Sequence, residues 1–152
     1  MNQKWVAFLR IVIGVFFLAQ GLNKLDWYTS SEFLRTSLDR YSQNSSPVTA
    51  WYQKHVAYPG IEAWSRMIPT GEMLIGIALV LGLLTRAALI SALALVLNYH
   101  LANGSLFTPV FFSNPYALVI LSCLLFLLAS KAGSVFAIDG SARKKTFKTK
   151  SK

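Results

Sequence analysis

Two apolar runs that follow one another in the middle of the chain constrain the fold most strongly. They cover residues 73–84 and 87–97, with a short break at Thr85 and Arg86 between them. Each run, with its flanks, approaches the roughly 20 residues that a helix needs to cross the hydrocarbon core of a bilayer. The stretch 67–103 therefore predicts a transmembrane helical hairpin, around which the other segments are arranged.

Composition favours a membrane protein over a soluble one. Of the 152 residues, 54% are hydrophobic and only 14% are charged, whereas a typical soluble domain carries about 25% charged residues. The length suits one domain. We predict a single transmembrane domain over residues 1–140, followed by a basic tail over residues 141–152.

The charge balance also indicates a membrane address. The net charge is +9, from 15 Lys and Arg against 6 Asp and Glu, and much of the surplus lies in the tail. Such a tail is typical of a cytoplasmic end that touches anionic lipid heads. Elements that read base edges are absent, so nucleic acid is not an expected partner.

Apolar segments before and after the hairpin predict two more spans. The first could also be a cleaved signal peptide, but Arg10 interrupts its apolar region and three later spans already hold the chain in the membrane. Gly14 and Gly21 lie on roughly one face of this helix, which would allow close helix approach. We predict an all-α integral membrane four-helix bundle with spans at about 5–25, 67–84, 87–103 and 115–131.

The long excursion over residues 26–66 is polar and rich in aromatic residues. Ser30 or Ser31 can cap one short amphipathic helix, and Ser46 followed by Pro47 can start a second. Aromatic residues in this pattern favour helices that lie on the membrane or cap the bundle.

Four spans place both termini on one side of the cell membrane, and the basic tail predicts that this side is the cytoplasm. The directions of the spans then gather polar residues in one layer near the outer surface. The members of this layer are Gln20, Asn23, Lys24, Glu72, Asn98 and His100. An ionisable group at such depth is a candidate for a functional site, and Lys24 is the expected partner of Glu72.

This outer layer has two interpretations. In the structural one, Glu72 is a helix-starting acid after Pro69, Lys24 snorkels to lipid heads, Asn98 bonds between helices and His100 is an exposed residue at a loop end. In the functional one, the layer is a pocket for a ligand with a polar ring and an apolar tail, such as a quinone. Glu72 or His100 would then exchange protons with the ligand.

A second layer of charge is expected at the cytoplasmic side. Arg10 and Arg86 lie there, and Asp139 is the acid predicted at that level. A pair of Asp139 with either arginine would hold the end of the fourth helix against the hairpin. We interpret these ion pairs as structural.

The chain offers little for electron transfer by itself. Its one cysteine, Cys123, lies in an apolar run and is read as a small hydrophobic residue. We find no haem-attachment motif, iron–sulfur cysteine cluster, dinucleotide-binding glycine loop or metal site. Electrons would have to come through a partner protein or directly from a substrate.

Short motifs spread over the whole chain resemble the DoxX family, close to the DoxD-like small subunit of thiosulfate:quinone oxidoreductase. The pieces are Leu9-Arg10-Ile11 with Gly14, Phe17-Leu18 and residues 21–25; Gly71-Glu72 with Gly76 and residues 81–86; residues 98–104; and Ile138-Asp139. The resemblance implies a four-helix protein of the cytoplasmic membrane and quinone-linked oxidation of a sulfur compound with a separate partner subunit. Its pattern positions are Lys24, Glu72, Arg86, Asn98 and Asp139.

Three functions follow as hypotheses. The first is a membrane redox subunit with a quinone pocket in the outer layer. The second is a non-enzymatic scaffold or assembly factor that docks partners through its aromatic outer helices, and either could form a homo-oligomer. The third is a small-solute transporter, against which the lack of an evident inverted repeat argues.

Overall fold

The structure is a computed structural model that describes residues 2–43, 45–106, 108–113, 115–130, 132–133 and 136–138. Its regular structure in these ranges is entirely helical, which confirms the all-α prediction. The elements are α1 (Gln3–Leu22), η1 (Leu25–Tyr28), α2 (Glu32–Ser42), α3 (Pro47–Tyr52), η2 (Gln53–Ala57), α4 (Ile61–Leu81), α5 (Thr85–Ala102), α6 (Pro109–Ser113) and α7 (Pro115–Ala129).

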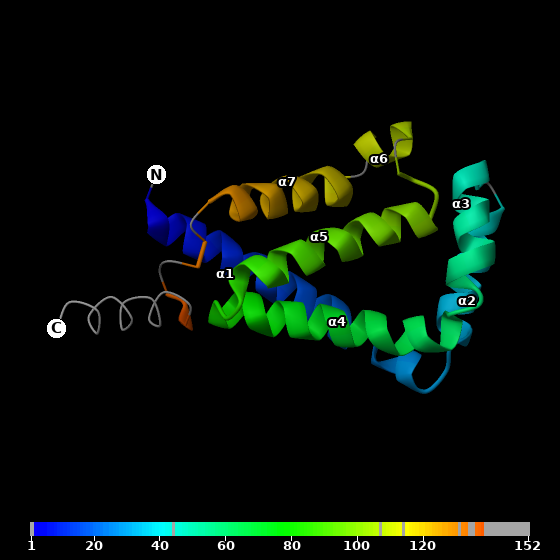
Figure 1. Ribbon diagram of the computed structural model, residues 1–152, viewed down its shortest axis with the longest axis horizontal. Helices are drawn as coiled ribbons and strands as arrows, with labels where there is room; N and C mark the ends of the chain where they lie inside the picture. The colour runs from blue at the N-terminus through cyan, green and yellow to red at the C-terminus, as the bar shows by residue number, and fades with distance from the viewer. Residues whose placement is uncertain are drawn as a thin grey trace.

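Four helices, α1, α4, α5 and α7, run along the long axis of the molecule (Figure 1). The short helices α2 and α3 lie across one end of this bundle, and we call residues 32–57 the cap. The start of α1 lies at the opposite end, where residues 132 and 136 meet Arg10. The cap thus follows the expectation of short helices between the first two spans.

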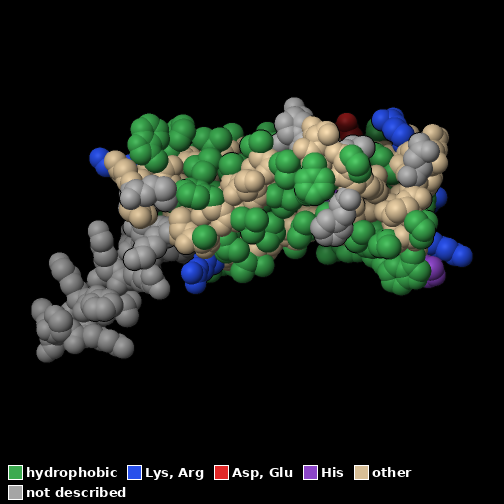
Figure 2. Space-filling view, turned by 90° about the horizontal axis from the view of Figure 1, so that it is seen from above, with side chains coloured by type: hydrophobic (Ala, Val, Ile, Leu, Met, Phe, Trp, Pro, Cys, Tyr) green, Lys and Arg blue, Asp and Glu red, His purple; other side chains and the backbone are tan. Residues whose placement is uncertain are grey.

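The long helices have the character of membrane spans. Helices α1, α4 and α5 are each long and apolar enough to cross a bilayer, while the described apolar part of α7, Ala117–Ala129, is shorter. Apolar side chains cover much of the face in Figure 2, and the Lys and Arg side chains seen there lie towards its two ends. Such a surface is suited to lipid, so the chain is a membrane protein.

Glycines let α1 and α4 approach closely, as the pattern of Gly14 and Gly21 predicted. A Cβ on Gly14 would lie 2.8 Å from the backbone nitrogen of Val80, and a Cβ on Gly76 would lie 2.6 Å from that of Leu18. A Cβ on Gly21 would lie 2.9 Å from the backbone of α4. In lipid there is no hydrophobic driving force that brings two helices together, so such close van der Waals packing is a main source of their association.

Helix α4 begins at Ile61, six residues earlier than the expected span, and Pro69 lies inside it. The reason is a continuous buried stripe on one face of α4, which runs straight through Pro69. Its members are Ile61, Ser65, Pro69, Glu72, Ile75, Gly76 and Leu79. Packing of this stripe outweighs the one backbone hydrogen bond that a proline removes.

The turn between α4 and α5 lies at Gly82–Leu84 rather than at Thr85 and Arg86, which already belong to α5. Gly82 adopts a left-handed backbone with φ of 66° and ends α4. Glycine is the usual residue for this position because it has no Cβ to clash. Leu84 also has a positive φ, 47°, just before α5 begins.

Candidate functional site

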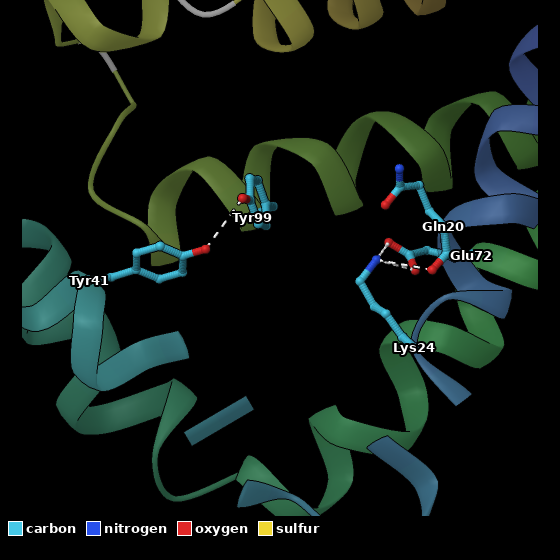
Figure 3. Close-up of polar contacts among 5 residues, drawn as sticks. All are labelled: Gln20, Lys24, Tyr41, Glu72 and Tyr99. Carbon is cyan, nitrogen blue, oxygen red and sulfur yellow. Dashed lines mark hydrogen bonds and ion pairs between the residues drawn. The ribbon is translucent and has the colours of Figure 1, made fainter. Parts of the chain in front are cut away.

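The predicted partnership of Lys24 and Glu72 is confirmed. The Nζ atom of Lys24 lies 2.7 Å from both carboxylate oxygens of Glu72, and Figure 3 shows the two side chains pointing at one another. The Glu72 side chain is 7% exposed and that of Lys24 is 21% exposed. Each charge therefore compensates the other in surroundings where a lone charge would be costly.

Helix α4 places Glu72 at this point, and the end of α1 places Lys24. Glu72 lies three turns after the start of α4 at Ile61, so the interpretation of Glu72 as a helix-starting acid is wrong. Lys24 follows the end of α1 directly, and its Nζ also lies 3.4 Å from the carbonyl oxygen of Gln20. The lysine is thus turned towards α4 and the last turn of α1, which differs from the snorkelling expected in the structural interpretation.

The short helix η1 holds aromatic residues against this ion pair. The Nζ of Lys24 lies 5.8 Å from the centre of the Trp27 ring, within the range of a cation–π interaction. The hydroxyl of Tyr28 lies 2.5 Å from Oγ1 of Thr70, two residues before Glu72 in α4. Both aromatics were expected to lie at the membrane interface, although their spacing of three and four residues from Lys24 was a signal for a contact with it.

His100 lies apart from the Lys24–Glu72 pair, at the junction of α5 and the loop before α6. It is only 3% exposed, so the expectation of an exposed residue at a loop end is wrong. Its Nδ1 lies 2.8 Å from Oγ of Ser105, and its ring makes edge contacts with Tyr99 and Phe111 at centroid distances of 5.3 and 5.1 Å. The loop following α5 thus folds back over the histidine.

Asn98 bonds to the cap. Its side-chain oxygen accepts a hydrogen bond from the Tyr52 hydroxyl, and the neighbouring Gln53 amide donates to the carbonyl of Ala102 at 2.9 Å. The π-helical turn η2 begins at Gln53 and brings this buried amide onto the end of α5. The interhelical role that was one interpretation of Asn98 therefore holds, with α3 as the partner.

Two tyrosines complete the contact between cap and bundle. The hydroxyls of Tyr41 and Tyr99 lie 3.4 Å apart, and their rings meet edge to face. Burial, together with the hydrogen bond to Tyr99, raises the pKa of Tyr41 to about 12. Burial also raises the pKa of Tyr52, against the effect of its bond to Asn98. Both cap phenols are therefore neutral hydrogen-bonding groups at physiological pH.

The predicted outer layer thus divides into two polar clusters. Over the described ranges, no hydrogen bond, ion pair or ring contact joins Asn98 or His100 to Lys24 or Glu72. Gln20 stays beside the ion pair through its carbonyl, and Figure 3 shows its side chain near Glu72. Asn23 ends α1 and is exposed. We call Gln20, Lys24, Trp27 and Glu72 the ion-pair cluster.

The opposite end of the bundle is built around Arg10, which is 0% exposed. Its Nη1 donates to the carbonyl of Ala132 at 2.8 Å and its Nη2 to that of Phe136 at 2.5 Å. Arg86 is exposed in the first turn of α5. Asp139 lies outside the described residues, so its ion pair with either arginine stays a prediction.

Other chemistry finds little support in the described part of the chain. No group of three or more His, Cys, Asp or Glu side chains there is arranged to hold a metal ion. Cys123 is partly buried in α7 and packs against the main core. Among the ion pairs in the described part of the chain, the one between Lys24 and Glu72 has a buried carboxylate, whereas the acids of the other two are exposed.

These observations define the class of protein: a helical membrane protein with a buried ion pair between its first and second long helices. The family model DoxX matches residues 5–103, more than half of the chain, and the protein therefore belongs to the DoxX family. The match runs from residue 5 in α1 to the end of α5 and includes Lys24, Glu72, Asn98 and His100, whereas Ser105 lies beyond it. No curated protein and no solved structure matches the chain.

Proposed function

We propose that this protein is a membrane subunit of a quinone-linked redox system, with the ion-pair cluster as the site for the quinone head group. The observation that carries the proposal is the contact of the Lys24 ammonium with the Glu72 carboxylate between two apolar helices. An ionisable pair held at this depth is costly for a purely structural purpose. Its apolar surroundings would accept a ligand that carries an apolar tail.

The two side chains can divide the work of proton exchange. A bound quinone takes up two electrons and two protons when it is reduced to the quinol. The three N–H donors of Lys24 can bind a ring oxygen and stabilise negative charge as it develops there. Glu72 lies against the same ammonium and can carry a proton at its carboxylate. The residual exposure of Lys24 leaves the pair open on one side.

The electrons would come from a separate partner subunit. The family resemblance suggests thiosulfate or a related sulfur compound as their source; joining two thiosulfate ions through a new S–S bond releases two electrons. We place the protein in the cytoplasmic membrane with both termini in the cytoplasm, on the strength of the basic tail. Labelling the tail lysines from the periplasmic side of intact cells would contradict this orientation.

The test replaces the acid of the ion pair and a matched acid on the same helix. Wild-type protein purified with native lipid should contain quinone. Glu72→Gln should lower thiosulfate-dependent quinone reduction in membranes about 100-fold, the lower end for a lost proton carrier. Glu62→Gln is the control, because Glu62 is exposed and pairs with Arg66 at the surface. Absence of quinone from the wild type and from Glu72→Gln, with unchanged reduction by the variant, would remove the proposal.

A scaffold or assembly factor is the second candidate, and the cap favours it. Large apolar side chains stand exposed there: Phe33 at 51%, Val48 at 65% and Trp51 at 59%. Such a surface can dock a partner protein. Crosslinking that recovers one stable partner, together with full activity of Glu72→Gln, would favour this function over the redox one.

A further inference from the structure

We propose that Trp27 is the positioning residue of the site, which holds the Lys24 ammonium over Glu72 and makes the ion pair depend on how the cap is docked. The inference rests on the proposed function of the ion-pair cluster. In this proposal Trp27 does not contact the substrate and acts through Lys24 alone.

The first step is the geometry around the ammonium. Glu72 occupies one side of Nζ at 2.7 Å, the Gln20 carbonyl lies at 3.4 Å, and the Trp27 ring lies with its centre at 5.8 Å. The backbone N–H of Trp27 donates to the carbonyl of Lys24 at 3.0 Å, so ring and lysine belong to one turn. The aromatic face attracts the cation and fills space into which a flexible lysine could otherwise swing.

The second step is the attachment of that turn to α4. The hydroxyl of Tyr28, the residue after Trp27, bonds to Oγ1 of Thr70, and that oxygen donates in turn to the carbonyl of Arg66. Lys24 therefore contacts α4 at Glu72, and Tyr28 contacts it at Thr70. The turn η1 is held at both ends, with Trp27 between them.

The third step is the contact of Trp27 with the cap. Its partly buried ring packs against a small apolar core separate from that of the bundle, formed by Leu34, Leu38, Ala57 and Ile61. Three of these four residues belong to the cap, and Ile61 starts α4. The ring that faces Lys24 thus also contacts the cap. A change in how the cap docks on α4 would therefore be expected to shift this ring.

The experiment compares Trp27→Leu, Trp27→Phe and the matched control Trp51→Leu. Trp51 is also in the excursion but is 59% exposed and stacks on His55. Trp27→Leu should weaken quinone binding about threefold to tenfold, the range of a partly buried cation–π contact. Trp27→Phe should restore part of the affinity, because a ring face remains, and Trp51→Leu should leave it unchanged.

Repeating Trp27→Leu in a Lys24→Met background distinguishes positioning of Lys24 from a purely structural role of Trp27. If Trp27 acts through Lys24, Trp27→Leu should cause little further loss of quinone binding there, so the two effects are not additive. Additive losses would overturn the inference, and so would wild-type affinity of Trp27→Leu. If Trp27→Leu fails to fold, the same cycle with Trp27→Phe decides.

The outcome for the positioning role can be told apart from that for the proposed function. Wild-type protein without quinone would sink the function alone. The cycle of Trp27 and Lys24 would then be measured on thermal unfolding, which needs no ligand. Coupling between the two substitutions would support the positioning of Lys24, and additive shifts would overturn it. If the wild-type protein contains quinone and Trp27→Leu binds quinone as tightly as the wild type, only the positioning role of Trp27 would be overturned.

Discussion

The two ends of the bundle each hold a cation, and the described partners of the two cations differ. Arg10, near the start of α1, is completely buried and donates to two main-chain carbonyls of the segment after α7. Lys24, just after the end of α1, keeps 21% of its side chain exposed and faces a carboxylate. Main-chain carbonyls neither move far nor change charge, whereas a carboxylate can do both.

This contrast indicates which of the two cations is suited to a structural role and which to chemistry. A guanidinium stays protonated at all accessible pH values, and its planar donors match fixed acceptors. An ammonium beside a carboxylate can exchange partners and protons. The end with Arg10 therefore closes the bundle, and the end with Lys24 is the better candidate for a site. Three predictions test this contrast.

The largest effect is expected at the structural end. Arg10→Met should lower the free energy of unfolding by about 3 kcal/mol, because the carbonyls of Ala132 and Phe136 lose a fully buried, charged donor. Chemical unfolding in lipid nanodiscs measures this loss. The control is Arg86→Met, whose exposed side chain should change stability by less than about 0.5 kcal/mol. Equal effects of the two substitutions would break the contrast.

A smaller effect is expected between the two ends, where α1 crosses α4. Gly76→Ala places a Cβ 2.6 Å from the backbone nitrogen of Leu18, so the helices must separate. We expect a loss of about 2 kcal/mol in unfolding free energy and a looser ion pair. Gly71→Ala is matched to it on the same helix, since its Cβ would lie 3.6 Å from Leu95 in ordinary contact. It should be neutral or stabilise α4 by up to about 1 kcal/mol.

The smallest effect concerns alkaline pH, which should loosen the cap end before the Arg10 end. The pKa of Tyr41 is raised from 10.0 to about 12 in the folded protein. The contribution of the neutral Tyr41 phenol to the free energy of unfolding is therefore complete below pH 10 and is lost as the pH rises towards 12. Titration of tyrosinate absorbance measures it: Tyr41→Phe should remove the late step.

Tyr99→Phe serves as the companion variant for this titration. It deletes the hydroxyl that bonds to Tyr41 and should move the ionisation of Tyr41 to lower pH. A late step that survives in Tyr41→Phe would show that another group is responsible. The end of the bundle built around Arg10 should keep its stability over this range, because its contacts are made by a guanidinium rather than by a phenol.

Part of the site was predictable because it follows from the order and direction of the long helices. The directions of the spans placed Lys24 and Glu72 at one level, and their opposite charges made them partners. The same reasoning grouped Asn98 and His100 with them, and there it was incomplete. Successive residues of a helix differ by about 100° in direction, so a shared level does not imply a shared face.

The amino-acid sequence was enough to predict a membrane protein, the order of its long helices and the pairing of Lys24 with Glu72. These properties follow from the length and apolar character of each segment, which are read along one dimension. Tertiary structure alone decided that Asn98 bonds to Tyr52, that His100 lies under Ser105 and Phe111, and that Trp27 faces Lys24. Those contacts depend on how each helix is rotated and how the cap docks, and packing between distant segments sets both.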